Sequence, residues 1–272
     1  LYTLADLNNK ELGWGQAGES WRFLAALERL GGESWFKLGD QDLATHIVRT
    51  NMLQTGARLS EVVSHLCEKM GIKHRLAPMS DDEVSTVVHT RTKGDLAFQH
   101  YFVRDRCEPA VTGFSFAGID KAKPSAGFSD AITPALKAVI VCPSNPFVSV
   151  DPILALPGIT DKLQQAGVPL IVVSNIVGGE ALKGPAAKMM RELAIPQTAL
   201  GVAEHYAKRY AKNHGDLIKG FVLDNKDKGL APKIEALGLA TIVTNTVMVT
   251  LPDRIELARR VLEFAANLRQ GP

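Results

Sequence analysis

Cysteine is scarce in this chain, and no two cysteines are close enough to form a Cys-x-x-Cys motif. The odd number of cysteines, Cys67, Cys107 and Cys142, argues against a framework of disulfide bonds. The seven histidines also lack the His-Glu-x-x-His spacing, or any other spacing, typical of zinc ligands. We therefore expect a protein of the reducing cytoplasm that is not a zinc enzyme.

Long apolar segments and an excess of one charge are missing as well. No run approaches the roughly 18–20 apolar residues of a membrane span, and the first residues do not form a signal-peptide pattern. The 31 basic and 29 acidic residues give a formal net charge of +2, without a dense run of Lys and Arg. We therefore expect no membrane insertion and no broad basic surface for nucleic acid, so an anion site must be local.

Four short apolar runs dominate the C-terminal half of the 272-residue chain, and each ends in polar or glycine-rich residues. Continuous Val, Ile and Leu without alternation is typical of strands buried on both faces of a parallel sheet. The spacers are long enough for crossover helices, so the pattern predicts a doubly wound α/β fold with a mostly parallel sheet. The four runs are 138–146, 169–179, 220–227 and 240–248.

Polar side chains follow these predicted strands. In a doubly wound sheet, ligands bind beyond the carboxyl ends of the strands. The sequence therefore predicts a ligand site at one edge of the sheet. The polar residues expected there are Ser144, Asn145, Ser174, Asn175, Asp224 and Asn245.

The N-terminal half has a more mixed pattern. Apolar spacing predicts helices over 19–30, from Asp42 to about Asn51, and over 58–70. Residues 86–103 are expected to form two strands around the turn at Lys93–Asp95. The simplest organisation is one domain, 1–272, that carries a helical and hairpin insertion.

Residues 35–46 (WFKLGDQDLATH) place Lys37, Asp40, Asp42 and His46 around a predicted strand-to-helix junction. The N–H groups at the start of the helix are predicted to face a bound anion. Asp40 and Asp42 could hold a hydrated Mg²⁺ or a substrate hydroxyl, and Lys37 could offset phosphate charge. The alternative is structural, with Asp42 as an N-cap and Lys37 as a solvated strand end.

Two loops after the predicted strands suit a nucleotide. In 142–146 (CPSNP), two prolines restrict the loop that carries Ser144 and Asn145, although a simple turn is an equal alternative. In 174–188 (SNIVGGEALKGPAAK), Gly178 and Gly179 permit close backbone approach and Lys183 adds positive charge. Because this segment matches neither Gly-x-Gly-x-x-Gly nor a Walker A sequence, phosphate binding is a weak inference from the residues alone.

Six segments in order and spacing resemble the 2-phospho-L-lactate transferase family. They are WFKLGDQDLATHIVRT, LAPMSDDEVST, FQHYFVRDRCEPAV, CPSNPFVSVDPILALPGI, VSNIVGGEALKGPAAKMM and GVAEHY. The resemblance implies a Rossmann-like fold, a cytoplasmic homodimer and a Mg²⁺-dependent reaction. In that reaction, the ribityl hydroxyl of a deazaflavin alcohol attacks a guanosine-diphosphate-activated lactyl, enolpyruvyl or glyceryl donor and releases GMP, in coenzyme F-420 biosynthesis.

The resemblance also assigns roles to particular residues. Lys37, with His46 nearby, would contact the deazaflavin, and Asp40 and Asp42 match the adjacent acidic positions. From the residue pattern we expect these two aspartates to serve catalysis and to bind the metal. Ser144, Asn145, Gly178 and Gly179 match loops that face the nucleotide, and Lys183 is expected from the residue pattern to add positive charge there. In the family a glycine-rich strand-turn-helix precedes the position of Leu1, so we expect the domain to lack it. The main alternative is a non-catalytic regulator of the same fold that binds a nucleotide sugar; an NAD-dependent oxidoreductase would need a fingerprint that these residues do not show.

Overall fold

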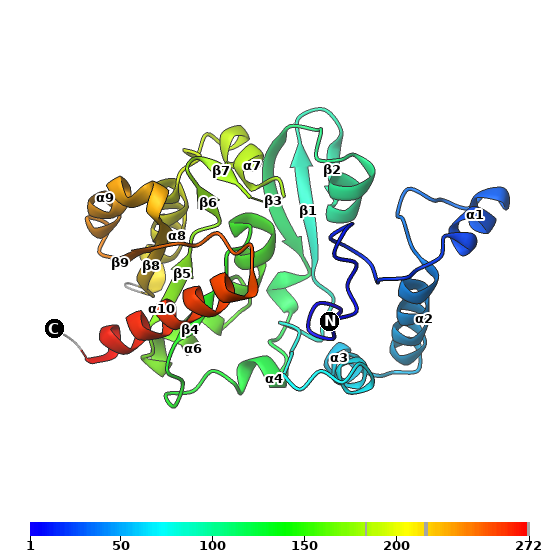
Figure 1. The fold of residues 1–272 in the computed structure, drawn as a ribbon, viewed down its shortest axis with the longest axis horizontal. Coiled ribbons are helices and arrows are strands. Elements are labelled where there is room, and N and C mark those ends of the chain that lie inside the picture. Colours follow the sequence, from blue (N-terminus) through cyan, green and yellow to red (C-terminus); the bar gives the residue numbers. More distant parts are fainter. Residues whose placement is uncertain (183, 215–216, 271–272) are drawn as a thin grey trace.

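A computed structural model describes residues 1–182, 184–214 and 217–270, arranged in three groups along the long axis of the molecule (Figure 1). A parallel sheet and its helices form one end, a small antiparallel sheet lies in the middle, and α1 and α2 form the other end. Within the described ranges, no helix is both long and apolar enough to cross a membrane.

The parallel sheet contains one strand from each of the four predicted runs. These strands are β4 (Val139–Val141), β5 (Leu170–Val173), β8 (Ile218–Asp224) and β9 (Ala240–Thr244). They lie in the order β4-β5-β8-β9, and every neighbouring pair is parallel. The predicted α/β fold with a mostly parallel sheet is therefore confirmed.

Helices cover both faces of this sheet. α6 (Ile159–Ala166) and α8 (Ala199–His214) contribute to the larger core on one face, and α10 (Leu251–Gln270) contributes to a smaller core on the other. Successive residues of a strand point to opposite faces, so β5 supplies both cores. Leu170 and Val172 belong to the larger core, and Ile171 and Val173 to the smaller one. This burial on both sides explains the uninterrupted apolar run in the sequence.

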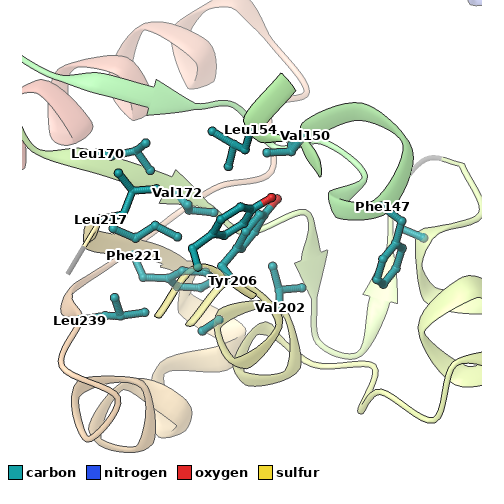
Figure 2. Packing of buried hydrophobic residues seen from close by; sticks show 14 of the residues in the cluster. Phe147, Val150, Leu154, Leu170, Val172, Val202, Tyr206, Leu217, Phe221 and Leu239 are labelled. Carbon is teal, nitrogen blue, oxygen red and sulfur yellow. The ribbon is translucent and has the colours of Figure 1, made fainter. Parts of the chain in front are cut away.

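The larger core is drawn in Figure 2. Tyr206 of α8 lies near Val172 of β5 and Phe221 of β8, and each of the three side chains is at most 1% exposed. On the opposite face, Gly220 lets α10 approach closely, because a Cβ there would lie 2.6 Å from the Phe264 ring. The sheet and α10 are thus held at a fixed separation.

The antiparallel sheet has the strand order β2-β1-β3, formed by β1 (Ser85–Thr90), β2 (Gly94–Ala97) and β3 (Val111–Ala117). The predicted hairpin is confirmed, since β1 and β2 pair across the turn. Its second strand is shorter than predicted: β2 ends at Ala97, and η1 (His100–Arg104) is a π-helix. Phe98 and Phe102 stack with ring centroids 5.4 Å apart, a contact between residues four apart that a helical backbone permits and a strand does not.

Three helices precede this sheet, as predicted. α2 (Asp40–Gln54) begins two residues earlier than expected, and α3 (Leu59–Lys69) ends just before Gly71, whose φ of +69° suits the residue after a helix. α1 (Arg22–Arg29) is shorter than the predicted 19–30 and has no fully buried residue. Its apolar spacing therefore does not mark a core-facing helix.

Shorter elements connect these groups. β6 (Ile176–Val177) and β7 (Glu180–Ala181) form a small hairpin after β5. The remaining elements are η2 (Ile119–Lys121), α4 (Ala126–Ser129), η3 (Pro146–Val150), α5 (Asp151–Leu154), α7 (Ala186–Glu192), η4 (Asn225–Leu230) and α9 (Ala231–Glu235).

Candidate functional site

A cavity of about 500 Å³ opens beyond the carboxyl ends of the parallel strands. The loops after β4, β5 and β9 line it, together with the β6–β7 hairpin and the first turns of α10. The lining residues are Pro143, Ser144, Asn145, Ser174, Asn175, Val177, Leu182, Thr246, Val247, Met248 and Arg254. The structure therefore places Ser144, Asn145, Ser174 and Asn175 together at the edge that the sequence predicted.

Asp224, the last residue of β8, supports this cavity from behind. Its carboxylate accepts hydrogen bonds from the backbone N–H of Thr246 at 2.8 Å, from Thr246 Oγ1 at 3.2 Å and from the Lys226 N–H at 3.0 Å. Both Asp224 and Thr246 are 3% exposed. Asp224 was expected beside a ligand, but it does not line the cavity and instead fixes the loop that does.

Like Thr246, Asn145 and Ser174 are polar lining residues that already have partners within the fold. Asn145 Oδ1 accepts the Phe147 N–H at 3.0 Å and caps η3, while its Nδ2 lies 3.2 Å from Met189 Sδ. Ser174 Oγ accepts the Ile176 N–H and donates to the Ile176 carbonyl. These contacts shape the loops and leave little hydrogen-bonding capacity for a ligand.

Asn175 differs from these neighbours. Its side-chain oxygen, Oδ1, is buried and accepts no hydrogen bond from any part of the chain that the structure describes. An unmade hydrogen bond of this kind costs roughly 1–3 kcal/mol. A ligand that donates an N–H or O–H group to Asn175 Oδ1 would remove that cost.

Gly178 and Gly179 form the two-residue turn between β6 and β7. Their φ values of +59° and +86° are those of a hairpin turn in which both central residues are left-handed, which explains why both are glycine. The Gly178 N–H donates to Asp227 Oδ2 at 3.0 Å. Neither glycine is among the lining residues, and Lys183, predicted to add charge to this loop, is outside the described residues.

The sequence did not indicate several lining residues. Val247 and Met248 follow β9 and, with Pro143, Val177 and Leu182, give the cavity an apolar wall. Arg254 lies in α10, and its position depends on how that helix crosses the sheet, which no local motif encodes. An apolar wall suits the face of a base or ring, and an arginine suits an anion.

The second predicted group lies at the start of α2. The Asp40 carboxylate accepts hydrogen bonds from the Ser20 backbone N–H at 2.8 Å and from Ser20 Oγ at 2.9 Å, and these bonds lower the pKa of Asp40. Asp42 Oδ1 accepts a hydrogen bond from the Tyr2 hydroxyl at 2.5 Å and lies 3.8 Å from His46 Nε2. Both aspartates therefore tie α2 to preceding segments.

Glu19 occupies the N-terminus of α2. Its Oε1 accepts the Asp42 N–H at 2.6 Å, and its Oε2 accepts the Gln16 N–H at 3.0 Å. Gly39 makes room for this carboxylate, because a Cβ there would lie 2.4 Å from Glu19 Cδ. The prediction that these helix N–H groups face a bound anion is wrong in this structure, since a carboxylate of the chain itself already fills the place.

The two predicted groups are separate in space. In Figure 1 the antiparallel sheet lies between α2 and the start of α10, and none of Lys37, Asp40, Asp42 and His46 lines the cavity. Lys37 is exposed, and its ammonium group has no hydrogen bond or ion pair within the described ranges. The cavity is therefore built without these four residues.

A parallel α/β sheet with a cavity at its carboxyl edge defines the class of open-sheet α/β proteins that bind their ligands at that edge. The model of the family 2-phospho-L-lactate transferase CofD matches residues 1–247. The chain belongs to this family and is a transferase.

Named relatives agree with this assignment. A phosphoenolpyruvate transferase of Streptomyces griseus is 37% identical over 99% of this chain and 83% of its own length. A 2-phospho-L-lactate transferase of Methanosarcina mazei is 34% identical over 97% of this chain and 83% of its own length. A solved Bacillus halodurans protein of the UPF0052 family has a TM-score of 0.54 at 13% identity, over 78% of this chain and 69% of its own, and is similar in fold alone.

Proposed function

We propose that the cavity at the sheet edge binds the guanosine diphosphate part of an activated donor. The observation that carries this proposal is the buried Asn175 Oδ1, which has no donor among the described residues and belongs to a side chain that lines a cavity with an apolar wall. A guanine base has N1–H and N2–H groups that can donate to such an oxygen, and its ring can lie against Val247 and Met248. The strand ends supply the rigid support that a selective site requires.

The proposed reaction moves a phospholactyl-type group, in its lactyl, enolpyruvyl or glyceryl form. The ribityl hydroxyl oxygen of 7,8-didemethyl-8-hydroxy-5-deazariboflavin forms a bond to the phosphorus on the acyl side of the donor. The bond from that phosphorus to the oxygen of GMP breaks, GMP leaves with the electron pair, and the hydroxyl proton passes to a base or to water. Alignment and charge stabilisation supply most of the catalysis in phosphoryl transfer, so no covalent intermediate is needed.

The residues at the start of α2 are proposed to serve the deazaflavin acceptor. The ammonium group of Lys37 has no partner among the described residues, and His46 lies on the same helix face as Asp42, four residues away. Asp40 and Asp42 are the proposed catalytic carboxylates. These groups lie apart from the cavity. The acceptor must therefore span the distance between α2 and the cavity, or α2 must move toward the cavity in the ternary complex.

Mg²⁺ dependence is also part of the proposal, and the diphosphate of the donor supports it. Mg²⁺ is commonly held by one or two carboxylates together with substrate phosphates. The described residues do not fit a preformed site: they include no group of three His, Cys, Asp or Glu side chains placed to hold a metal ion. The Asp40 carboxylate is also engaged by Ser20. No step of the mechanism is therefore assigned to the ion.

We further propose a cytoplasmic homodimer. Cys67, Cys107 and Cys142 are all free thiols, as a reducing compartment would keep them. Large apolar side chains are exposed in the N-terminal region, including Leu30 at 87% and Ile47 at 58%, and a second copy could cover them. Light scattering at micromolar concentration should give twice the chain mass; a monomeric mass would contradict the dimer.

Calorimetric titration tests the binding proposal. The protein should bind GDP more tightly than NAD or a uridine-diphosphate sugar, and Asn175→Ala should weaken GDP binding about ten- to a hundredfold. Asn175→Asp keeps an acceptor and should retain binding, and Asn225→Ala, an exposed asparagine outside the cavity, is the matched control. Tighter binding of the uridine-diphosphate sugar would favour the regulator instead.

Mass spectrometry tests the reaction itself. Incubation with the deazaflavin alcohol, Mg²⁺ and each of the three donors should give a phosphodiester whose mass identifies the preferred acyl group. Release of GMP in the same mixture should match the amount of phosphodiester. Binding of GDP without any product from the three donors would overturn the proposed reaction.

A further inference from the structure

Arg254 combines a positive charge with the lack of a partner among the described residues. Among the lining residues that the structure describes, it is the one ionisable side chain. Its guanidinium group also makes no hydrogen bond or ion pair with any described residue. An arginine that faces a cavity without a carboxylate partner is available for an anionic ligand.

The other arginines of α10 do have partners. Arg259 pairs with Glu256, and Arg260 pairs with Glu263 at 3.4 Å. Arg269 donates to the Leu136 carbonyl at 3.0 Å. Within the described part of this helix, the unpaired arginine is therefore the one at the cavity.

The acidic neighbour of Arg254 is occupied. Asp253 Oδ2 accepts hydrogen bonds from the Thr250 N–H and Thr250 Oγ1, both at 2.7 Å, and from the Val249 N–H at 3.1 Å. These bonds from Thr250 lower the pKa of Asp253. Asp253 thus caps the start of α10 rather than neutralising Arg254.

The backbone that carries Arg254 is firmly held. One turn further along α10, Leu257 is 5% exposed, and Val261 is 2% exposed, both in the core that includes Ile171 and Val222. On the N-terminal side of Arg254, the hydrogen bonds that Asp253 accepts from Val249 and Thr250 fix the backbone of the first turn. The guanidinium group therefore extends from a rigid helix and varies in position only through its own side chain.

We infer that Arg254 binds a phosphate of the nucleotide donor and so sets the preference for a nucleoside diphosphate over the nucleoside. A planar guanidinium can donate two parallel hydrogen bonds to phosphate oxygens, whereas the unpartnered atom of Asn175 is Oδ1, an acceptor that a deprotonated phosphate oxygen cannot use. The inference rests on the proposed function of the cavity.

The test compares Arg254→Gln, Arg254→Lys and Arg260→Gln with the unaltered protein by calorimetry, using GDP and guanosine as probes. Arg254→Gln should weaken GDP binding about ten- to a hundredfold and leave guanosine binding unchanged. Arg254→Lys keeps the charge and should restore part of the GDP affinity. Arg260→Gln removes an exposed arginine of the same helix and should bind GDP normally.

The possible outcomes distinguish the role of Arg254 as a phosphate ligand from the proposed nucleotide-binding function of the cavity. If Arg254→Gln weakens GDP and guanosine binding equally, or weakens neither, Arg254 is not a phosphate ligand, while the proposed site stands on the GDP affinity of the unaltered protein. If the unaltered protein binds neither GDP nor guanosine, the proposed function fails and the inference fails with it. Melting temperature distinguishes a folding defect, and we expect none because Arg254 is exposed.

Discussion

The buried carboxylate of Asp224 receives two hydrogen bonds from Thr246, one from its backbone nitrogen at 2.8 Å and one from its hydroxyl at 3.2 Å. Asp224 is the last residue of β8, and Thr246 lies two residues beyond β9. The pair therefore joins the ends of two neighbouring strands and sets where Val247 and Met248 enter the cavity. The shape of the cavity at this edge therefore depends on Asp224, which does not itself line the cavity.

Asp224→Asn should lower both stability and nucleotide affinity. The new amide group would place a donor where donors from Thr246 or Lys226 now point, and an unsatisfied buried donor costs roughly 1–3 kcal/mol. We expect a lower urea midpoint with an unchanged slope, together with weaker GDP binding in calorimetry. Thr246→Ser keeps both donors and should stay close to the original on both measures. An Asp224→Asn protein with unaltered stability would show that this pair does not hold the loop.

The parallel sheet could be predicted because its signal is local. Strands buried on both faces must be apolar at every position, so Leu170–Val173 is recognisable without any knowledge of its neighbours. The polar residues that follow such strands then have to lie at one edge. Ser144 and Asn175 could be assigned to that edge on topology alone, and the structure places both there.

Contacts between distant segments could not be read in the same way. Glu19 lies 23 residues before Asp42, and nothing in either segment shows that its carboxylate fills the start of α2. Arg254 reaches the cavity only because α10 crosses the sheet at a particular angle. Residues 98–103 were predicted to continue the second strand of the hairpin, but stacking of Phe98 on Phe102 stabilises a helical turn. Residue propensities predict most helices and strands, whereas contacts between side chains determine the structure in these exceptions.

Lys37→Ala should reduce turnover without a matching loss of stability. The ammonium group has no partner within the described residues and is exposed, so its removal leaves the fold without a broken contact. If it balances charge near the reacting phosphate, turnover should fall by one or two powers of ten, roughly 1.4–2.8 kcal/mol of barrier. Lys10→Ala, which removes an exposed lysine paired with Asp6, is the control. Full activity of Lys37→Ala would remove this residue from the site.

The four tyrosines should make the protein sensitive to alkali. Burial raises the pKa of Tyr101, Tyr206 and Tyr210, and burial followed by the hydrogen bond to Asp42 raises the pKa of Tyr2 to about 12. An unfolded tyrosine titrates near pH 10, so this stability is fully present below about pH 10 and is lost as the pH rises through the folded pKa values.

Tyrosinate absorbance should therefore stay low at pH 10 and rise above it together with the loss of circular dichroism. Tyr2→Phe should remove one titrating group and the contact to Asp42 without changing the behaviour of the buried three. Tyrosinate absorbance that develops near pH 10 in a protein with native circular dichroism would contradict the burial of these side chains.

Asp40→Asn and Asp42→Asn should lose more activity than stability if these carboxylates serve transfer. Each substitution keeps the size of the side chain and removes its charge, so a catalytic or metal-binding role and a tethering role predict different results. Ser20→Ala and Tyr2→Phe separate the two roles, because they remove the hydroxyl bonds to Asp40 and Asp42 while leaving both carboxylates in place; the Ser20 backbone N–H still donates to Asp40. If Asp40 is catalytic, Asp40→Asn should reduce turnover at least tenfold more than Ser20→Ala does, although the two variants melt at the same temperature. The loss of turnover in Asp40→Asn should also become larger when Mg²⁺ is limiting. Equal losses in the two members of each pair would show that both aspartates only anchor α2, and the base for the ribityl hydroxyl would then have to come from elsewhere in the enzyme.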